Sequence, residues 1–276
     1  MDRKILLGSD YDGTFRRSGD SPSHEDVEAV RRFKAAEGVF GIVTGRVPAH
    51  ITDIFDKLDG ICDFLLCSNG GICFMPDKSI AFSNEIPADD LHELYRICCE
   101  CDPWYAQADI MSLTDEYSTT EELSRAFSAN EDEQRIYLNG YIGSVPHCFF
   151  VKPEALKNIR SFTQFSSYFR TVEDTYRAME MIEKAFPGKY ECYCQGKCFD
   201  TTPAGVSKSS GLARVAEYFG VECENIYTAG DGWNDVDMLK AYNGIAMSGI
   251  EREIMDSAKW VFDSVGEAIH SIFELH

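Results

Sequence analysis

The sequence predicts an α/β protein, with a three-layer core around a parallel sheet and a second, inserted α+β domain. Three observations lead to this expectation. With 276 residues, the chain is longer than most single cores. Its first and last thirds alternate short apolar runs with amphipathic helical segments, as in sheets whose parallel strands are joined by helical crossovers. Its middle third instead contains longer runs typical of antiparallel strands. We therefore expect a core formed by residues 1–83 and 196–276, interrupted by an inserted domain at residues 84–195.

Short apolar runs predict three buried strands in the first third. They are Ile5–Leu7, Val39–Val43 and Phe64–Cys67. A helix is expected between the first two strands, from a capping sequence at Ser23 to Gly38. A second helix is expected from Pro48, because Pro suits a first helical turn and apolar residues then recur at helical spacing through Leu58. The first third therefore predicts strands that alternate with helices.

The last third has the same alternation, whereas the middle differs. In the last third we expect a helix at Lys208–Phe219 and strands at Ile226–Ala229, Gly244–Met247 and Trp260–Phe262. In the middle we expect helices at 88–101 and 171–185, antiparallel strands within 104–113, 134–143 and 147–153, and a strand pair within 190–200. This change of pattern is the basis for the inserted domain.

The charge of the chain limits the partners that it can bind. Lys and Arg number 26 and Asp and Glu 46, for a net charge of −20. This excess of negative charge argues against non-specific binding to nucleic acid or to anionic membranes. The apolar run before Gly8 is too short for a signal peptide, and no stretch approaches the ~20 apolar residues of a membrane span. We expect a cytoplasmic protein, monomeric or homodimeric.

Cysteines are frequent and scattered. The eleven residues include Cys192, Cys194 and Cys198 near one another and a cluster at 98–101. Zinc or redox chemistry is one interpretation, but neither spacing fits the paired C-x₂₋₄-C units of structural zinc sites. Reduced thiols in a cytosolic protein are the better interpretation.

Polar residues follow four of the predicted core strands where each strand ends. They are Asp10, Asp12 and Thr14 after the first strand, Thr44, Gly45 and Arg46 after the second, Ser68, Asn69 and Gly70 after the third, and Asp231, Asn234 and Asp235 after the strand at 226–229. Open α/β sheets bind their ligands outside the carboxyl ends of the strands. The four loops are therefore expected to converge on one pocket.

Lys208 is the expected first residue of a helix. A cation at a helix N-terminus opposes the helix dipole, so its position needs an explanation. An anion held beside it would remove the conflict.

Four segments of the chain resemble the motifs of a known family. The segments "DYDGT" (Asp10–Thr14), "VTGR" (containing Thr44), "GVSKSSGL" (containing Lys208) and "GDGWNDVDML" are similar, in order and spacing, to the four signatures of the haloacid dehalogenase (HAD) superfamily. More narrowly, "SNGG", "CFDTTPAGVSK" and "GIAMSGIEREIMDSAKWV" resemble its Cof-type phosphatases, which carry a large α+β cap. The resemblance covers the core segments; over residues 84–195 it rests on length and general pattern. It implies a Rossmann-like core and a cap that selects the substrate.

The resemblance also implies roles for individual residues. Asp10 would attack phosphorus and form an aspartyl-phosphate, and Asp12 would protonate the leaving oxygen and then activate water. A Mg²⁺ cofactor would be bound by the carboxylates of Asp10 and Asp231 and the backbone carbonyl of Asp12, with Asp235 orienting the metal site. The phosphate group would be bound by Thr44, Gly45, Arg46, Lys208 and Asn234.

Several residues depart from the family pattern. They are Ser9 and Tyr11 around the nucleophile, Arg16 and Arg17 in place of a Leu pair, Ser209 after Lys208, and Asp200 in place of Glu. None of these changes removes a catalytic group, so we interpret them as variation in packing or specificity.

The expected activity is Mg²⁺-dependent hydrolysis of a small phosphorylated metabolite. A sugar phosphate is the leading substrate class, followed by nucleotide-type phosphates and pyridoxal phosphate. Two alternatives stay open: a phosphotransferase or phosphomutase on the same core, and a non-catalytic sugar-phosphate sensor. The Asp10/Asp12 pair argues against the sensor, because a sensor does not need a proton-handling Asp12.

Overall fold

The computed structural model describes residues 4–19, 21–48, 51, 54–112, 124–127, 148–150 and 161–275, with side chains left out at 104–112, 124–127 and 148–150. The chain divides into two compact units. The core unit comprises Met1–Gly45, Asp53–Phe82 and Ser207–His276, and the inserted unit comprises Arg46–Thr52 and Ser83–Val206. Among the helices of the described ranges, none is both long and apolar enough to cross a lipid bilayer.

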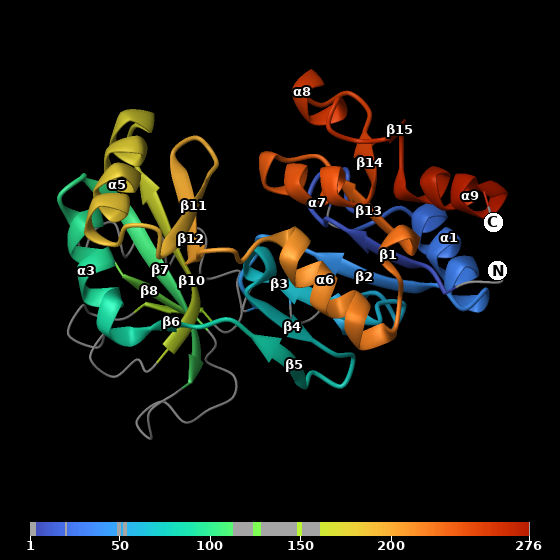
Figure 1. The fold of residues 1–276 in the computed structure, drawn as a ribbon, viewed down its shortest axis with the longest axis horizontal. Helices are drawn as coiled ribbons and strands as arrows, with labels where there is room; N and C mark the ends of the chain where they lie inside the picture. The colour runs from blue at the N-terminus through green and yellow to red at the C-terminus, as the bar shows by residue number, and fades with distance from the viewer. Residues whose placement is uncertain are drawn as a thin grey trace. The chain divides into compact units, whose positions relative to one another are not determined.

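The core unit is built on an eight-stranded sheet of order β15-β14-β13-β1-β2-β3-β4-β5 (Figure 1). Its strands are β1 (Leu6–Ser9), β2 (Val39–Val43), β3 (Phe64–Cys67), β4 (Ile72–Phe74), β5 (Ile80–Ser83), β13 (Ile226–Gly230), β14 (Asn243–Met247) and β15 (Trp260–Phe262). The pairs from β15 to β3 are parallel, and β4 is antiparallel to β3. The predicted strands are confirmed, and β2, β3 and β15 have the predicted bounds.

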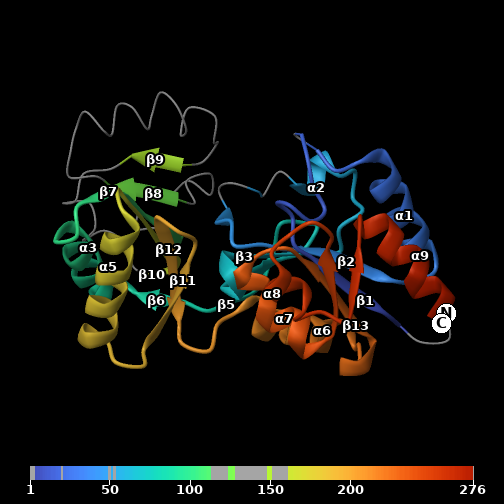
Figure 2. The ribbon, with the colours of Figure 1, turned by 90° about the horizontal axis from the view of Figure 1, so that it is seen from above.

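Helices cover both faces of this sheet. Figure 2 shows α1 (His24–Ala35) and α9 (Val265–Leu275) on one side, and α6 (Lys208–Phe219) and α7 (Val236–Ala241) on the other. Apolar residues of α6, such as Leu212 and Val215, pack in one cluster with Leu6 of β1 and Leu66 of β3. On the opposite face, Phe33 and Phe273 meet edge to face at 6.2 Å. The three-layer α/β core is therefore confirmed.

Two helix predictions differ from the structure. The first helix begins after Ser23, whose side chain accepts from the Asp26 N–H as predicted, but it ends at Ala35. The left-handed residue that follows is Glu37, at φ 65°. Gly38 is needed for space, because a Cβ there would lie 2.5 Å from the Phe33 ring. The helix expected from Pro48 appears within the described residues only as α2 (Ile54–Lys57); 49, 50, 52 and 53 lie outside them.

The inserted unit is an α+β structure with helices α3 (Ala88–Cys99) and α5 (Val172–Ala185). Its described strands are β6 (Ile86–Pro87), β7 (Pro103–Ser112), β8 (Ser124–Phe127), β9 (Cys148–Phe150), β10 (Ser161–Phe169), β11 (Tyr190–Cys194) and β12 (Cys198–Pro203), in the order β11-β12-β10-β7-β8-β9 with β6 paired to β10. Apolar side chains of both helices, including Leu94 and Ile182, pack against Phe162 and Phe165 of the sheet. α3 ends two residues before the expected position.

The strand pattern of this unit differs from the prediction in two places. β10, which pairs with both β7 and β12, falls on a segment for which no strand was predicted. β8 also falls where no strand was predicted, and β9, which lies within the run at 147–153 that was expected to be antiparallel, pairs with β8 in parallel. The run expected at 134–143 lies outside the described residues.

The end of the inserted unit also differs from the expected boundary. In the structure this unit extends to Val206, whereas the sequence predicts the boundary between 195 and 196. The expected boundary falls in the turn between β11 and β12. These strands pair along their length, from Tyr190 with Pro203 to Cys194 with Phe199, so both belong to one sheet.

Candidate active site

The loop after β1 presents the first carboxylate. The Asp10 N–H donates to the Ala229 carbonyl of β13 at 2.8 Å, which fixes Asp10 at the carboxyl end of the sheet. A tight turn follows, in which the Phe15 N–H donates to the Asp10 carbonyl at 3.2 Å. Gly13 adopts φ 85°, and a Cβ there would lie 2.1 Å from Oδ2 of Asp231. Only glycine lets the two loops approach so closely.

The loop after β13 presents two more carboxylates. Oδ2 of Asp235 accepts hydrogen bonds from the N–H groups of Asp231 (3.0 Å) and Gly232 (2.9 Å), which closes the loop on itself. Oδ1 of Asp231 accepts from the Thr14 hydroxyl at 2.5 Å. One carboxylate oxygen from each of Asp10, Asp231 and Asp235 lies within 4.8 Å of the others. The structure therefore brings three predicted acidic residues together.

Lys208 lies among these carboxylates. It begins α6 and is 1% exposed. Its Nζ donates to Oδ1 of Asp10 and to Oδ1 of Asp235, both at 2.6 Å. The conflict between the cation and the helix dipole is thus offset by two buried carboxylates.

Burial controls the ionisation of this group. It raises the pKa of Asp10 to about 8, against the opposing effect of Lys208, and it also raises the pKa of Asp231. Burial alone would lower the pKa of Lys208, but Asp10 and Asp235 outweigh it and the pKa is raised. One ammonium among three carboxylates leaves an excess of negative charge when all of them are ionised. A further cation would remove that excess.

The oxygen set fits a divalent metal such as Mg²⁺, which prefers oxygen ligands. Both carboxylate oxygens of Asp235 already accept hydrogen bonds. Asp10 and Asp231 each accept through Oδ1 among the described residues. The second oxygen of each is the better candidate for direct metal binding, and Asp235 is better suited to orienting the loop and Lys208.

The candidate phosphate-binding residues lie near this cluster. Thr44 is buried at the end of β2, and its carbonyl accepts from the Asn69 N–H at 3.1 Å. Oδ1 of Asn69 accepts from Nδ2 of Asn234 at 3.0 Å. A Cβ on Gly45 would lie 3.0 Å from Oδ1 of Asn69 and 3.2 Å from Nδ2 of Asn234. Asn69 therefore joins the loops after β2, β3 and β13.

The sequence predicts Asn69 at this pocket but gives it no specific role. Both Ser68 and Asn69 adopt left-handed φ values, 53° and 50°, although neither is glycine. Backbone held in this region is strained and is concentrated at functional sites. The signal in the sequence was the segment "SNGG" at the same sheet edge as the acidic residues.

Two further predicted site residues are Asp12 and Arg46. The carboxylate of Asp12 is not one of the three grouped acidic residues; its side chain is 39% exposed and pairs with Arg16. Arg46 is half-buried and belongs to the inserted unit. The role of Arg46 at the site stays a prediction.

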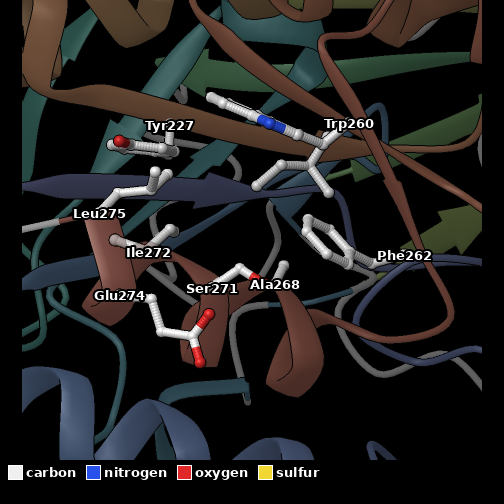
Figure 3. Close-up of a pocket in the computed structure, with 9 residues that line it drawn as sticks. Tyr227, Trp260, Phe262, Ala268, Ser271, Ile272, Glu274 and Leu275 are labelled. Atoms are coloured by element: carbon white, nitrogen blue, oxygen red, sulfur yellow. The ribbon is translucent and has the colours of Figure 1, made fainter.

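A separate cavity in the core unit has a different character (Figure 3). It measures about 170 Å³ and lies between the sheet and α9. Tyr227 and Trp260 stack at 6.0 Å on the sheet side, opposite Ile272 of α9. The carboxylate of Glu274, the only charged group lining it, points away from the two rings in Figure 3. This cavity is apolar and contains none of the acidic cluster.

Comparison with known proteins is consistent with this geometry. A family model described as haloacid dehalogenase-like hydrolase matches residues 7–273. The chain is 23% identical over 285 residues to the 5-amino-6-(5-phospho-D-ribitylamino)uracil phosphatase YwtE of Bacillus subtilis, covering 95% of this chain and 93% of the relative.

Solved structures share the fold. The HAD subclass IIB sugar phosphatase BT4131 superposes with a TM-score of 0.75 at 20% identity, covering 98% of both chains. BT1666 of Bacteroides thetaiotaomicron superposes with a TM-score of 0.75 at 23% identity, covering 99% of this chain and 95% of that one. The chain belongs to the haloacid dehalogenase-like hydrolase family.

Proposed function

We propose that this protein is a Mg²⁺-dependent phosphatase that hydrolyses a small phosphorylated metabolite through an aspartyl-phosphate at Asp10. The observation that carries the proposal is the Lys208 ammonium, buried between Asp10 and Asp235 at 2.6 Å from each. A structural ion pair does not need three carboxylates around one cation. A site that binds a divalent metal beside a phosphate dianion needs both the carboxylates, as metal ligands, and the cation, to offset the negative charge.

Asp10 is the proposed nucleophile. One of its carboxylate oxygens bonds to phosphorus while the bond from phosphorus to the ester oxygen breaks, and the ester oxygen takes the proton of the Asp12 carboxyl to leave as an alcohol. In the second step Asp12 takes a proton from water. The water oxygen bonds to phosphorus, the bond to Asp10 breaks, and inorganic phosphate leaves with the Asp10 carboxylate restored.

The surrounding residues supply charge and orientation. Lys208 favours the ionised form of Asp10 that the first step needs, and it offsets charge on the phosphoryl oxygens. Mg²⁺ would be bound by the carboxylates of Asp10 and Asp231 and by the backbone carbonyl of Asp12. There it would neutralise the negative charge of the nucleophile and the phosphate. Thr44, Gly45, Asn234 and Arg46 are proposed to bind the phosphoryl oxygens, with Asn69 holding the amide of Asn234 in place.

A phosphate ester on a polyhydroxylated carbon chain is the proposed substrate class. BT4131 is named a sugar phosphatase, and the named substrate of YwtE carries its phosphate on a ribityl chain. Residues 84–195 would form the cap that selects among such esters. We also propose a cytoplasmic location, since the ten cysteines with described side chains are all thiols, as a reducing compartment maintains.

The test is phosphate release from a panel of sugar phosphates, polyol phosphates, nucleotides and pyridoxal phosphate, with Mg²⁺ or with chelator. We expect release that needs Mg²⁺ and is fastest on a sugar or polyol phosphate. Transfer of phosphate to an added sugar with little free phosphate would favour a phosphotransferase. Tight binding of a sugar phosphate with no turnover of any ester would favour the sensor instead.

Metal binding should also change stability, with a defined dependence on pH. In the metal-free protein the pKa of Asp10 is raised to about 8, so between pH 4 and 8 the folded state holds a proton that the unfolded state has released. This group therefore contributes less stability as pH rises through that range. Because Mg²⁺ binds the ionised carboxylates, the increase in Tm that it causes should be larger at pH 8 than at pH 6. At 100 times Kd the stabilisation is about 2.7 kcal/mol.

Thermal unfolding with Mg²⁺ or chelator at both pH values measures this effect. Asp231→Asn should remove most of the Mg²⁺-induced shift. Asp237→Asn is the matched control, because Asp237 is exposed on the neighbouring helix and should leave the shift unchanged. A shift that persists in Asp231→Asn would place the metal elsewhere.

A further inference from the structure

Arg16 lies beside Asp12 because the turn after β1 brings their backbones together. The Gly13 N–H donates to the Arg16 carbonyl at 3.0 Å, and the Arg16 N–H donates to the Tyr11 carbonyl at 2.7 Å. Asp12 and Arg16 form an isolated β-bridge. Nη2 of Arg16 then donates to Oδ1 of Asp12. The ion pair is therefore built on a closed turn, and does not depend on two freely moving side chains.

The guanidinium is held from a second side as well. It lies over the ring of Tyr11, 5.3 Å from the ring centroid, and Tyr11 is buried. Stacking on an aromatic ring restricts the planar guanidinium, and its fork geometry fixes a carboxylate more firmly than an ammonium would. Arg16 is consequently the better-anchored member of the pair; its side chain is 25% exposed against 39% for Asp12.

This arrangement is unfavourable as a device for stability. Nε of Arg16 is buried without a hydrogen-bond partner, alone in this respect among side-chain nitrogens and oxygens of the described residues. A buried N–H group without a hydrogen-bond partner destabilises the folded state by more than a part-exposed ion pair stabilises it. The pair is thus better explained by what it does to Asp12 than by its contribution to folding.

The placement of the Asp12 carboxylate matters for its proposed role as proton donor. Its carboxylate lies outside the group formed by Asp10, Asp231 and Asp235. Misplacing a catalytic group by about 1 Å can cost about 100-fold in rate, so a contact that restricts the rotamers of Asp12 favours catalysis.

We propose that Arg16 is a positioning residue that holds the Asp12 carboxylate where it acts on the leaving-group oxygen. The inference rests on the proposed function, in which Asp12 transfers that proton. Arg16 touches neither phosphate nor metal in this role and acts only through Asp12. Its loss should therefore matter most for esters whose leaving oxygen needs a proton.

The experiment compares wild type, Arg16→Ala, Asp12→Asn and the double variant on two substrates. One is the alkyl phosphate that wild type turns over fastest in the panel, and the other is p-nitrophenyl phosphate, whose leaving group departs without a proton. The quantity is kcat/KM, which covers the steps up to transfer of the phosphoryl group to Asp10. We expect Arg16→Ala to lower it about 10- to 100-fold for the alkyl ester, and several-fold less for the aryl ester.

Two further comparisons separate positioning from a structural effect. Arg16→Ala should cause no additional loss in the Asp12→Asn background, and Arg16→Lys should restore part of the activity. Arg17→Ala is the matched control: its guanidinium donates to the carbonyls of Asp263 (2.7 Å) and Ser248 (2.8 Å), so any loss it causes should be the same in both backgrounds.

The outcomes are distinguishable. An equal loss on both ester classes, or an undiminished effect of Arg16→Ala in the Asp12→Asn background, would overturn the positioning role and leave Asp12 as the proton donor. Full activity of Asp12→Asn on the alkyl ester would instead overturn the proposed role of Asp12 itself.

Discussion

Asp10→Asn is expected to lower phosphate release from every substrate by about 10⁴-fold or more, because an amide does not replace the carboxylate as nucleophile. The substitution changes neither the size nor the shape of the side chain, and the amide oxygen can still accept the hydrogen bond that Lys208 donates to Oδ1. The protein should therefore stay folded. Steady-state phosphate release, with Mg²⁺ saturating, measures the loss.

Stability gives an independent check on the same variant. Burial disfavours the charged form of Asp10, so a neutral amide at this position removes a desolvation cost that grows as pH rises toward the pKa of about 8. Without metal, Asp10→Asn should melt at least as high as wild type at pH 8, and its advantage should shrink at pH 5. Asp237→Asn, with its exposed carboxylate, should show neither effect. Activity of Asp10→Asn near that of wild type would exclude Asp10 as the nucleophile.

The parts of the site that the sequence predicts are those set by local backbone geometry. The loop after β1 is one example: Gly13 has to be glycine both for its φ of 85° and for the approach of Asp231. The position of Lys208 at the start of α6 is another, because the dipole conflict required a nearby anion and the structure provides two. Parallel strands then bring these loops to one edge, so short motifs predict a long-range cluster.

Elements that depend on pairing between distant segments were harder to predict. β10 contains buried polar residues such as Thr163 and Gln164, and its register with β7 shifts in several places. Such irregularities break the alternation from which a strand is recognised. The parallel pairing of β8 with β9 is likewise a property of topology, because nothing in either segment specifies its direction.

The side-chain partners within the site also could not be predicted from the sequence. The bond between Asn69 and Asn234 joins residues 165 positions apart, and no pattern near either residue requires it. Arg16 was noted only as a departure from the family motif. Its contact with Asp12 depends on the closed turn between them, which becomes visible once the backbone hydrogen bonds of Gly13 and Arg16 are known.

Lys208→Met should reduce both activity and stability, since methionine fills similar space but provides no charge. Without the ammonium, Asp10 and Asp235 each lose the ion-pair partner that lies at 2.6 Å. The negative charge of these buried carboxylates is then no longer neutralised. Breaking a buried ion pair in this way costs about 3–5 kcal/mol. Loss of one preorganised charge at the reacting group lowers kcat by about 10²- to 10³-fold. Thermal unfolding and phosphate release measure the two effects.

The pH dependence of that destabilisation identifies its cause. Lys208 lowers the pKa of Asp10 against the effect of burial, so without it the folded state holds the Asp10 proton to higher pH. The unfolded state releases the proton near pH 4, so both proteins lose stability as pH rises to about 8. Above pH 8 wild type has released the Asp10 proton, whereas the variant still holds it and should continue to lose stability. Mg²⁺ should recover part of the loss, because a divalent cation compensates the same carboxylates. Lys240→Met, which removes an exposed lysine from α7, should change stability by less than about 0.5 kcal/mol at any pH. A loss for Lys208→Met that is independent of pH and of Mg²⁺ would mean that the residue stabilises the fold by packing, and that its charge does not neutralise the acidic site.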